Sequence, residues 1–235
     1  MRWLSSIGEA FYNAWIPEKR YLAYLSGLRM TLLISLFAVM IGILIGILIA
    51  VTRVSARHSK SPLVHFLDQF ARLYVTVIRG TPMIVQILII YNLVFTSPNT
   101  NPVVVGAVCC GINSGAYVAE IIRAGIESIP IGQMEAGRSL GLSYRTTMTS
   151  IILPQAIRNI LPALGNEFIS LIKETSVISI IAVNDLTKMA GYVGSRTWDV
   201  IPPYVIAALF YLAMTLGLSK ALGAVEKYLA KGQRK

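Results

Sequence analysis

Polar and charged side chains occur inside several long apolar stretches of this 235-residue sequence. In one stretch Asn113 and Glu120 lie seven residues apart, which places them on one face of a helix. In another, Asn166 and Lys173 share a face, and Glu167 lies about 100° around the same helix axis. A charge at the centre of a bilayer costs about 2.5–3.5 kcal/mol, so such residues usually face a bundle interior or a water-filled cavity. These stripes therefore predict a polar path across a membrane.

The composition indicates a membrane protein. Hydrophobic residues make up 55% of the sequence and charged residues 14%, and the formal net charge is +10. Soluble domains are about 45–50% apolar and about 25% charged, and disordered chains are poor in apolar residues, so both classes are excluded. Apolar spans with basic ends explain the positive charge, and no nucleic acid partner is expected. The adjacent Cys109 and Cys110 lack disulfide or metal-ligand spacing, so we expect no metal site and no cofactor.

Five segments are long and apolar enough to cross about 30 Å of hydrocarbon as helices. The predicted spans lie at about 29–52, 63–95, 102–124, 158–183 and 202–225, within a single transmembrane domain over 1–235. This predicts an all-α integral membrane fold with five transmembrane helices. We expect the second span to be one long helix kinked at Pro82, because proline removes a hydrogen bond from a helix interior. Aromatic residues before the first span predict an amphipathic N-terminal helix at the membrane interface.

The distribution of lysine and arginine predicts the orientation, because these residues are enriched on the cytoplasmic side. Fourteen of them lie within 53–79, 123–158 and 220–235, against five before Arg29 and within 185–202. Arg29 and Lys173 are not counted, because they lie at or within spans. We therefore expect the N-terminus outside and the C-terminus in the cytoplasm. The basic C-terminal tail over 227–235 is expected to contact anionic lipid headgroups.

The longest connection, a cytoplasmic loop over 125–157, has its own helical pattern. Pro130 is typical of a helix start, and Gly141 is typical of a helix end. A short helix over 133–140 and a second one from Thr146 would project a compact knob into the cytoplasm. Knobs of this kind bind in grooves of partner proteins.

The same loop resembles the EAA signature of importer-type ABC transporter permeases. Glu135-Ala136-Gly137, then Gly141, and after nine further residues Ile151, followed by Leu153-Pro154, match that signature, with Gly137 where alanine is usual. In that family the segment couples the permease to a cytoplasmic ATPase. The resemblance implies that role for the residues of the loop: Gln133, Glu135, Ala136, Gly137, Ser139, Leu140, Gly141 and Leu142.

The resemblance covers most of the chain and narrows to the polar amino acid importers. Motifs similar to that subfamily lie in the second, third and fourth spans: Arg79-Gly80-Thr81-Pro82 with Gln86, Asn113–Tyr117 with Glu120, Leu164–Phe168 and Lys173–Ser176. What this implies is a type I importer fold in a bacterial inner membrane, with a second permease copy or paralogue, two ATPase subunits and an extracytoplasmic amino-acid-binding protein. No Walker A pattern occurs in the sequence, so ATP would be bound by the partner subunits.

An amino acid substrate needs an acceptor for its ammonium group and donors for its carboxylate. Glu167 is our candidate for the ammonium group or a cationic side chain, and Arg79 for the carboxylate, because its planar guanidinium binds two oxygens at once. The candidate substrate-binding residues are Arg79, Thr81, Gln86, Asn113, Tyr117, Glu120, Asn166, Glu167 and Lys173.

Several of these residues also have structural interpretations. Glu120 can pair with Arg123 along its own helix, Arg79 can lie at the interface, and Asn113 can bond a neighbouring helix. The acidic residues of the fourth span favour a cationic substrate such as arginine, lysine or histidine, and a neutral one such as glutamine or cystine remains an alternative. A small membrane enzyme or an ATP-independent channel is the alternative from another class.

Overall fold

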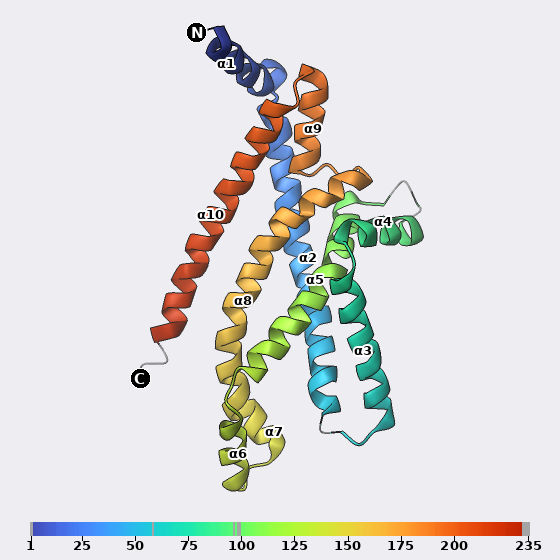
Figure 1. Cartoon of the computed structure of the whole chain (residues 1–235), viewed down its shortest axis with the longest axis vertical. Helices are drawn as coiled ribbons and strands as arrows, with labels where there is room; N and C mark the ends of the chain where they lie inside the picture. Colours follow the sequence, from blue (N-terminus) through green and yellow to red (C-terminus); the bar gives the residue numbers. More distant parts are fainter. Residues whose placement is uncertain (1, 58, 96, 98–99, 232–235) are drawn as a thin grey trace.

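In a computed structural model of the chain, the described residues are 2–57, 59–95, 97 and 100–231, and they form helices without a β-strand (Figure 1). This confirms the predicted all-α class. The longer helices are α1 (Arg2–Trp15), α2 (Tyr21–Ala56), α3 (Pro62–Gly80), α4 (Met83–Val94), α5 (Pro102–Glu127), α8 (Leu153–Glu174), α9 (Leu186–Thr197) and α10 (Ile201–Lys231). The shorter ones are η1 (Pro17–Lys19), α6 (Ile131–Ser139), α7 (Tyr144–Thr147), η2 (Met148–Ile152) and η3 (Thr175–Ile181).

Helices α2 and α5 pack tightly along their lengths and form the centre of the molecule. Small residues allow this close approach. A Cβ atom added to Gly46 of α2 would lie 2.4 Å from a methyl carbon of Val118 on α5. Both cysteines of α5, Cys109 and Cys110, are buried in the apolar core against Ile34 of α2. The close packing of α2 and α5 therefore fixes the positions of the polar residues on α5.

The predicted second span is broken more sharply than a proline kink. Helices α3 and α4 are bent by 115° at residues 81–82, so the expectation of one long helix over 63–95 is wrong in this respect. Thr81 adopts an extended conformation (φ −124°, ψ 151°), as residues before proline often do. The proline thus ends α3 completely and starts α4 in another direction.

By length and apolarity, three helical stretches in the described part could cross a membrane: Pro17–Ala56, Pro102–Glu127 and Ile201–Tyr228. The bent pair α3 and α4 would add a fourth span. Helix α8 is also long, but polar residues such as Glu167 and Lys173 reduce its apolarity. It lies between α5 and α10 (Figure 1) and continues as the 3-10 helix η3 through Ile181.

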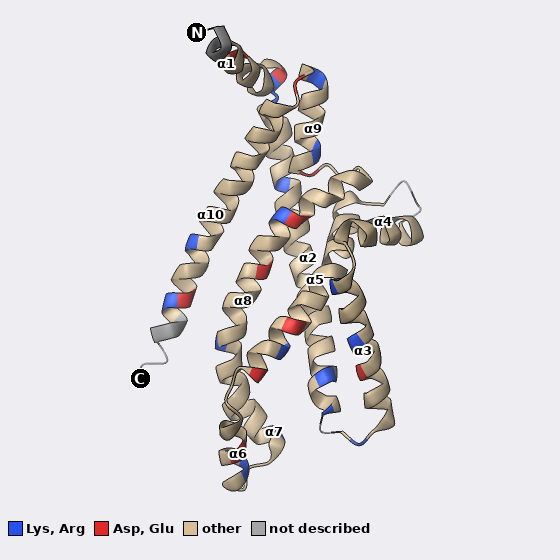
Figure 2. Cartoon of the chain, viewed as in Figure 1, with Lys and Arg blue, Asp and Glu red and all other residues tan. Residues whose placement is uncertain are grey.

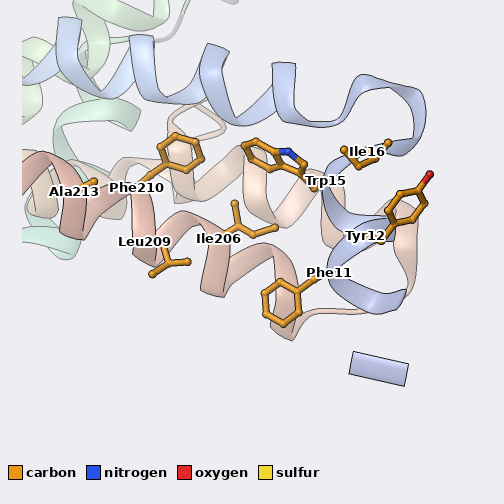
Figure 3. A pocket seen from close by; sticks show the side chains of 8 residues that line it. All are labelled: Phe11, Tyr12, Trp15, Ile16, Ile206, Leu209, Phe210 and Ala213. Atoms are coloured by element: carbon orange, nitrogen blue, oxygen red, sulfur yellow. The ribbon is translucent and has the colours of Figure 1, made fainter. Parts of the chain in front are cut away.

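The two ends of the molecule carry different elements. Helices α1 and α9 lie at one end, and α6 and α7 lie at the other (Figure 1). At the first end, the ring of Trp15 stacks on Tyr24 and Phe210, with centroid distances of 5.6 and 6.0 Å. An apolar pocket of about 550 Å³ lies there between α1 and α10 (Figure 3). Residues 232–235 of the basic tail lie outside the described residues.

Candidate functional site

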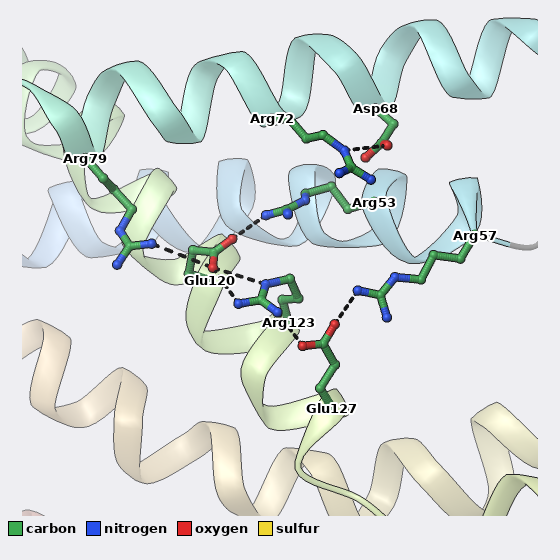
Figure 4. A network of polar contacts seen from close by, with 8 residues as sticks. All are labelled: Arg53, Arg57, Asp68, Arg72, Arg79, Glu120, Arg123 and Glu127. Atoms are coloured by element: carbon green, nitrogen blue, oxygen red, sulfur yellow. Dashed lines mark hydrogen bonds and ion pairs between the residues drawn. The ribbon is translucent and has the colours of Figure 1, made fainter. Parts of the chain in front are cut away.

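Glu120 of α5 lies among arginines from three helices (Figure 4). Its carboxylate accepts two hydrogen bonds from Arg123, at 2.8 and 3.1 Å, and one from Arg53 of α2. An Nη atom of Arg79 on α3 lies 3.6 Å from Oε2 of Glu120, the oxygen that also accepts from Arg123. The guanidinium of Arg79 also covers the ring of Tyr117 at 5.5 Å. The expected pair of Glu120 and Arg123 is therefore one part of a larger cluster.

A second carboxylate extends this cluster toward the end of α5 (Figures 2 and 4). Glu127 pairs with Arg123 on its own helix and with Arg57 at the end of α2. The linked groups, which we call the arginine cluster, comprise four arginines and two glutamates and carry a net charge of +2: Arg53, Arg57, Arg79, Glu120, Arg123 and Glu127. The cluster joins α2, α3 and α5 and retains an excess of positive charge.

A second polar group holds the break between α3 and α4. The amide nitrogen of Gln86 donates to the carbonyl oxygens of Ile78 and Thr81, at 2.7 and 3.0 Å, and contacts the Thr81 hydroxyl at 2.7 Å. Its amide oxygen accepts a hydrogen bond of 2.8 Å from Asn113 of α5. Gln86 and Asn113 are 7% and 3% exposed. Gln86 thus satisfies backbone groups at the bend, and Asn113 bonds a residue of a neighbouring helix, as its structural interpretation anticipates.

The third group lies on α8. Glu167 is half-buried and accepts a hydrogen bond of 2.7 Å from the hydroxyl of Ser114 on α5. Asn166 is exposed and bonds the carbonyl of Pro162 within its own helix. Lys173 is exposed, and within the described part of the chain its side chain makes no ion pair. Glu167 is therefore the acidic residue of this helix that faces the centre of the bundle.

The structure divides the nine candidate substrate residues among these three groups. Arg79 and Glu120 belong to the arginine cluster, and Tyr117 lies under Arg79. Thr81 lies beside Gln86 at the helix break, where Gln86 bonds Asn113. Sequence reasoning did not assign Arg53, because it was counted only as a basic residue beside a span. Ser114 lay within a recognised motif but was not singled out. Arg53 pairs with Glu120 and Ser114 with Glu167, and in each pair the two residues are more than fifty positions apart. Helical periodicity does not reveal contacts at such a distance in sequence.

The knob formed by α6 and α7 has a compact internal structure. A Cβ atom added to Gly137 would lie 2.5 Å from the Thr147 methyl carbon, so only glycine fits here without movement. Gly141 has a φ of +83°, the left-handed conformation that glycine favours. The amide of Gly141 donates to the Arg138 carbonyl and that of Leu142 to the Gly137 carbonyl, which is the Schellman pattern of a helix end. The loop thus has a fixed shape.

The outer surface of the knob exposes apolar and polar side chains together. Leu140 is 82% exposed and Ile131 is 76% exposed. Most of the predicted coupling residues are also exposed: Gln133, Glu135, Ala136, Ser139, Leu140 and Gly141. Burial raises the pKa of the Tyr144 hydroxyl behind them, and the charge of Arg57 partly offsets this effect. Leu140 and Ile131 thus give the knob exposed apolar surface.

Within the described residues, no group of three histidine, cysteine, aspartate or glutamate side chains is placed to hold a metal ion. The polar groups instead offer hydrogen bonds and charges. They can bind and orient a polar solute, or hold helices together, without forming or breaking covalent bonds.

Residues 42–234 match the family described as binding-protein-dependent transport system inner membrane components. A permease protein of Rickettsia bellii (strain RML369-C), named for glutamine transport, is 38% identical over 215 residues, which cover 89% of this chain and 94% of that protein. The arginine transport system permease protein ArtQ of Bacillus subtilis (strain 168) is 35% identical over 223 residues, covering 93% of this chain and 96% of ArtQ.

The structure resembles a chain from the crystal structure of an amino acid ABC transporter with histidines. The TM-score is 0.82 at 44% sequence identity, with 89% of this chain and 95% of that chain covered. The matched family is a membrane transport component and not an enzyme. The chain therefore belongs to the family of binding-protein-dependent transport system inner membrane components, among the permease subunits of polar amino acid ABC importers.

Proposed function

We propose that this permease imports a cationic amino acid, such as arginine, lysine or histidine. The observation that carries the proposal is the Glu167 carboxylate, half-buried on α8 and bonded to Ser114 of α5. Only one of its oxygens takes the Ser114 hydrogen bond, so the other can accept from an ammonium or guanidinium group. The similarity to an arginine permease and to a transporter solved with histidines supports the same substrate class.

The proposed assembly contains two ATPase subunits, a second permease copy or paralogue, and an extracytoplasmic amino-acid-binding protein. The ATPase subunits would bind the knob through the exposed Leu140 and Ile131. The chain itself would need no cofactor, because ATP would be bound by the partner subunits. We place it in a bacterial inner membrane with its N-terminus outside, so that the knob faces the cytoplasm.

Motion of the knob would reach the substrate path through two helices. The knob follows α5 and precedes α8 in the chain, and the break at residues 128–130 is short. The Asn159 side chain on α8 donates a hydrogen bond of 2.8 Å to Ser128 at the end of α5. Closure of the ATPase subunits would therefore move α5 and α8 as rigid bodies. This motion would change the distance between Glu167 on α8 and Ser114 on α5.

The proposal is tested by Glu167→Gln in the complete transporter reconstituted in vesicles. Glutamine keeps the size of the side chain and removes its charge. We expect the apparent affinity for arginine to fall about tenfold, because a charge-assisted hydrogen bond contributes about 1.5–3 kcal/mol. Competition of radiolabelled arginine uptake by unlabelled arginine, lysine, histidine and glutamine measures the change.

The matched control is Glu226→Gln, which removes an exposed carboxylate from α10. It should leave uptake unchanged. Unchanged arginine affinity in Glu167→Gln would contradict the proposed site. A parent transporter that prefers glutamine would instead favour the neutral alternative, which the similarity to the glutamine-named permease supports.

A further inference from the structure

Two adjoining cavities lie between the spans and the knob. The larger, about 500 Å³, is bounded by facing aliphatic stripes of α2 and α8, with Ile122 and Ile126 of α5 between them. The smaller, about 260 Å³, contains Arg57 and Glu127. The two share four lining residues, so they form one continuous cleft, which we call the loop cleft: Val54, Ile126, Tyr144 and Met148.

The dimensions of the loop cleft match one leaflet of a bilayer. Its α2 side runs from Ile43 to Ser55, and the twelve steps between these residues rise about 18 Å along a helix. Half of the hydrocarbon core of a bilayer is about 15 Å thick. Its apolar rim is open to the surroundings, since Val51 and Ile157 are 57% and 48% exposed. An acyl chain therefore fits the cleft in both length and chemistry.

The polar end of the loop cleft carries positive charge. The Arg57 side chain is 55% exposed and uses one of its Nη atoms to bind Glu127. A guanidinium has five N–H donors in a planar fork that suits phosphate oxygens. The arginine cluster, to which Arg57 belongs, has a net charge of +2. This end of the cleft is thus complementary to an anionic headgroup.

We infer that the loop cleft binds an anionic phospholipid, with its phosphate at Arg57 and an acyl chain between α2 and α8. In the cleft wall, Tyr144 belongs to α7 of the knob and Met148 begins η2 directly after it, whereas Ile47 and Ile157 belong to α2 and α8. The lipid therefore contacts both parts at once and supports the position of the knob. The inference concerns a lipid site and is independent of the substrate proposed above.

Lipid binding can be measured with Met148→Trp, because Met148 lines both cavities. The full-length chain carrying this reporter is reconstituted in phosphatidylcholine vesicles that contain phosphatidylglycerol. In separate samples, the same small fraction of one lipid or the other carries bromine in its acyl chains. The quenching of the added tryptophan is the fluorescence quenching of the reporter chain minus that of the parent chain. We expect brominated phosphatidylglycerol to bind at least about fivefold more strongly than brominated phosphatidylcholine.

Arg57→Gln in the reporter chain should reduce this preference about fivefold, since one basic residue near a membrane surface contributes about that factor. Arg57→Lys keeps the charge and should retain most of the preference. Lys220→Gln, which removes an exposed charge from α10, is the matched control and should change nothing. Equal quenching by the two lipids, or an unchanged preference in Arg57→Gln, would overturn the inference. Absence of quenching by either lipid would also overturn it, because no acyl chain would then lie beside position 148.

Discussion

The charge of Glu120 on α5 is compensated by arginines of its own helix and of two others. Glu120 has three arginine partners, and its side chain is 18% exposed. Two of the partners, Arg53 and Arg79, come from α2 and α3. For Arg79 to hold a substrate carboxylate, as its residue type suggests, it would have to share or leave its contact with Glu120. The main role of the arginine cluster is thus to join α2, α3 and α5.

Removing the charge of Glu120 should destabilise the permease strongly. In Glu120→Gln three arginines lose their common counter-charge, and breaking such a largely buried pair costs about 3 kcal/mol. We expect a clear fall in the midpoint of thermal unfolding of the purified protein in detergent.

Glu127→Gln is the comparison, because Glu127 is more exposed and lies at the edge of the cluster. Its loss should cost about 1 kcal/mol or less. If both variants lowered the unfolding midpoint equally, the central role assigned to Glu120 would be incorrect.

Among the elements, the break between α3 and α4 depends both on Pro82 and on the side chains packed around it. Pro82 was expected to kink a span, yet α3 and α4 are bent by 115°. A break of this size leaves carbonyl groups without partners inside the protein, which is costly unless other groups bond them. Gln86 bonds two of them, and Asn113 fixes Gln86 in turn. The bend is therefore stabilised by Gln86 and Asn113, two residues proposed from the sequence for substrate binding.

At the knob, Gly137→Ala should weaken coupling even though alanine is the usual residue of the EAA signature. The new methyl group would lie 2.5 Å from the Thr147 methyl carbon and 2.9 Å from its hydroxyl oxygen. Overpacking of this kind costs about 1–3 kcal/mol and would move α6 away from α7. We expect reduced ATPase stimulation and uptake in the reconstituted transporter.

Gly132→Ala is the matched control on the same helix, since nothing lies within 4 Å of its added Cβ atom. It should be neutral, or stabilise α6 by up to about 1 kcal/mol. Combining Gly137→Ala with Thr147→Ala should restore part of the activity, because it removes the two closest atoms. Full activity of Gly137→Ala alone would show that the tight contact has no role in coupling.

For the whole molecule, the basic residues predict which end faces the cytoplasm. Ser61→Cys, before α3, and Ser195→Cys, in α9, lie at opposite ends of the bundle, and both serines are exposed. We expect a membrane-impermeant maleimide to label position 195 in intact cells and position 61 in inverted vesicles. The natural Cys109 and Cys110 are 1% and 0% exposed, so they should give little background.

Labelling of both positions from the same side would contradict the topology, and the reverse pattern would invert the orientation. The parent chain, which retains the two buried cysteines, is the control for background labelling. The positive-inside bias is the physical reason for the expectation, with fourteen basic residues assigned to the cytoplasmic side and five to the other.

The sequence by itself determined the membrane class, the helical architecture, the knob and the family. These features depend on composition, on periodicity and on motifs whose residues lie close together in the chain. Gly141, for example, ends α6 as its position after the helix predicts, because a left-handed cap is a local requirement.

Only the tertiary structure decided which polar residues share a site. Arg53 and Glu120 are 67 residues apart, and Ser114 and Glu167 are 53 residues apart. Helical spacing places a side chain on a face, but the partner of that face depends on how the helices cross. The structure accordingly divided one expected substrate site into the arginine cluster, the helix break and Glu167. Of these, Glu167 has the fewest protein partners and remains the candidate for the substrate.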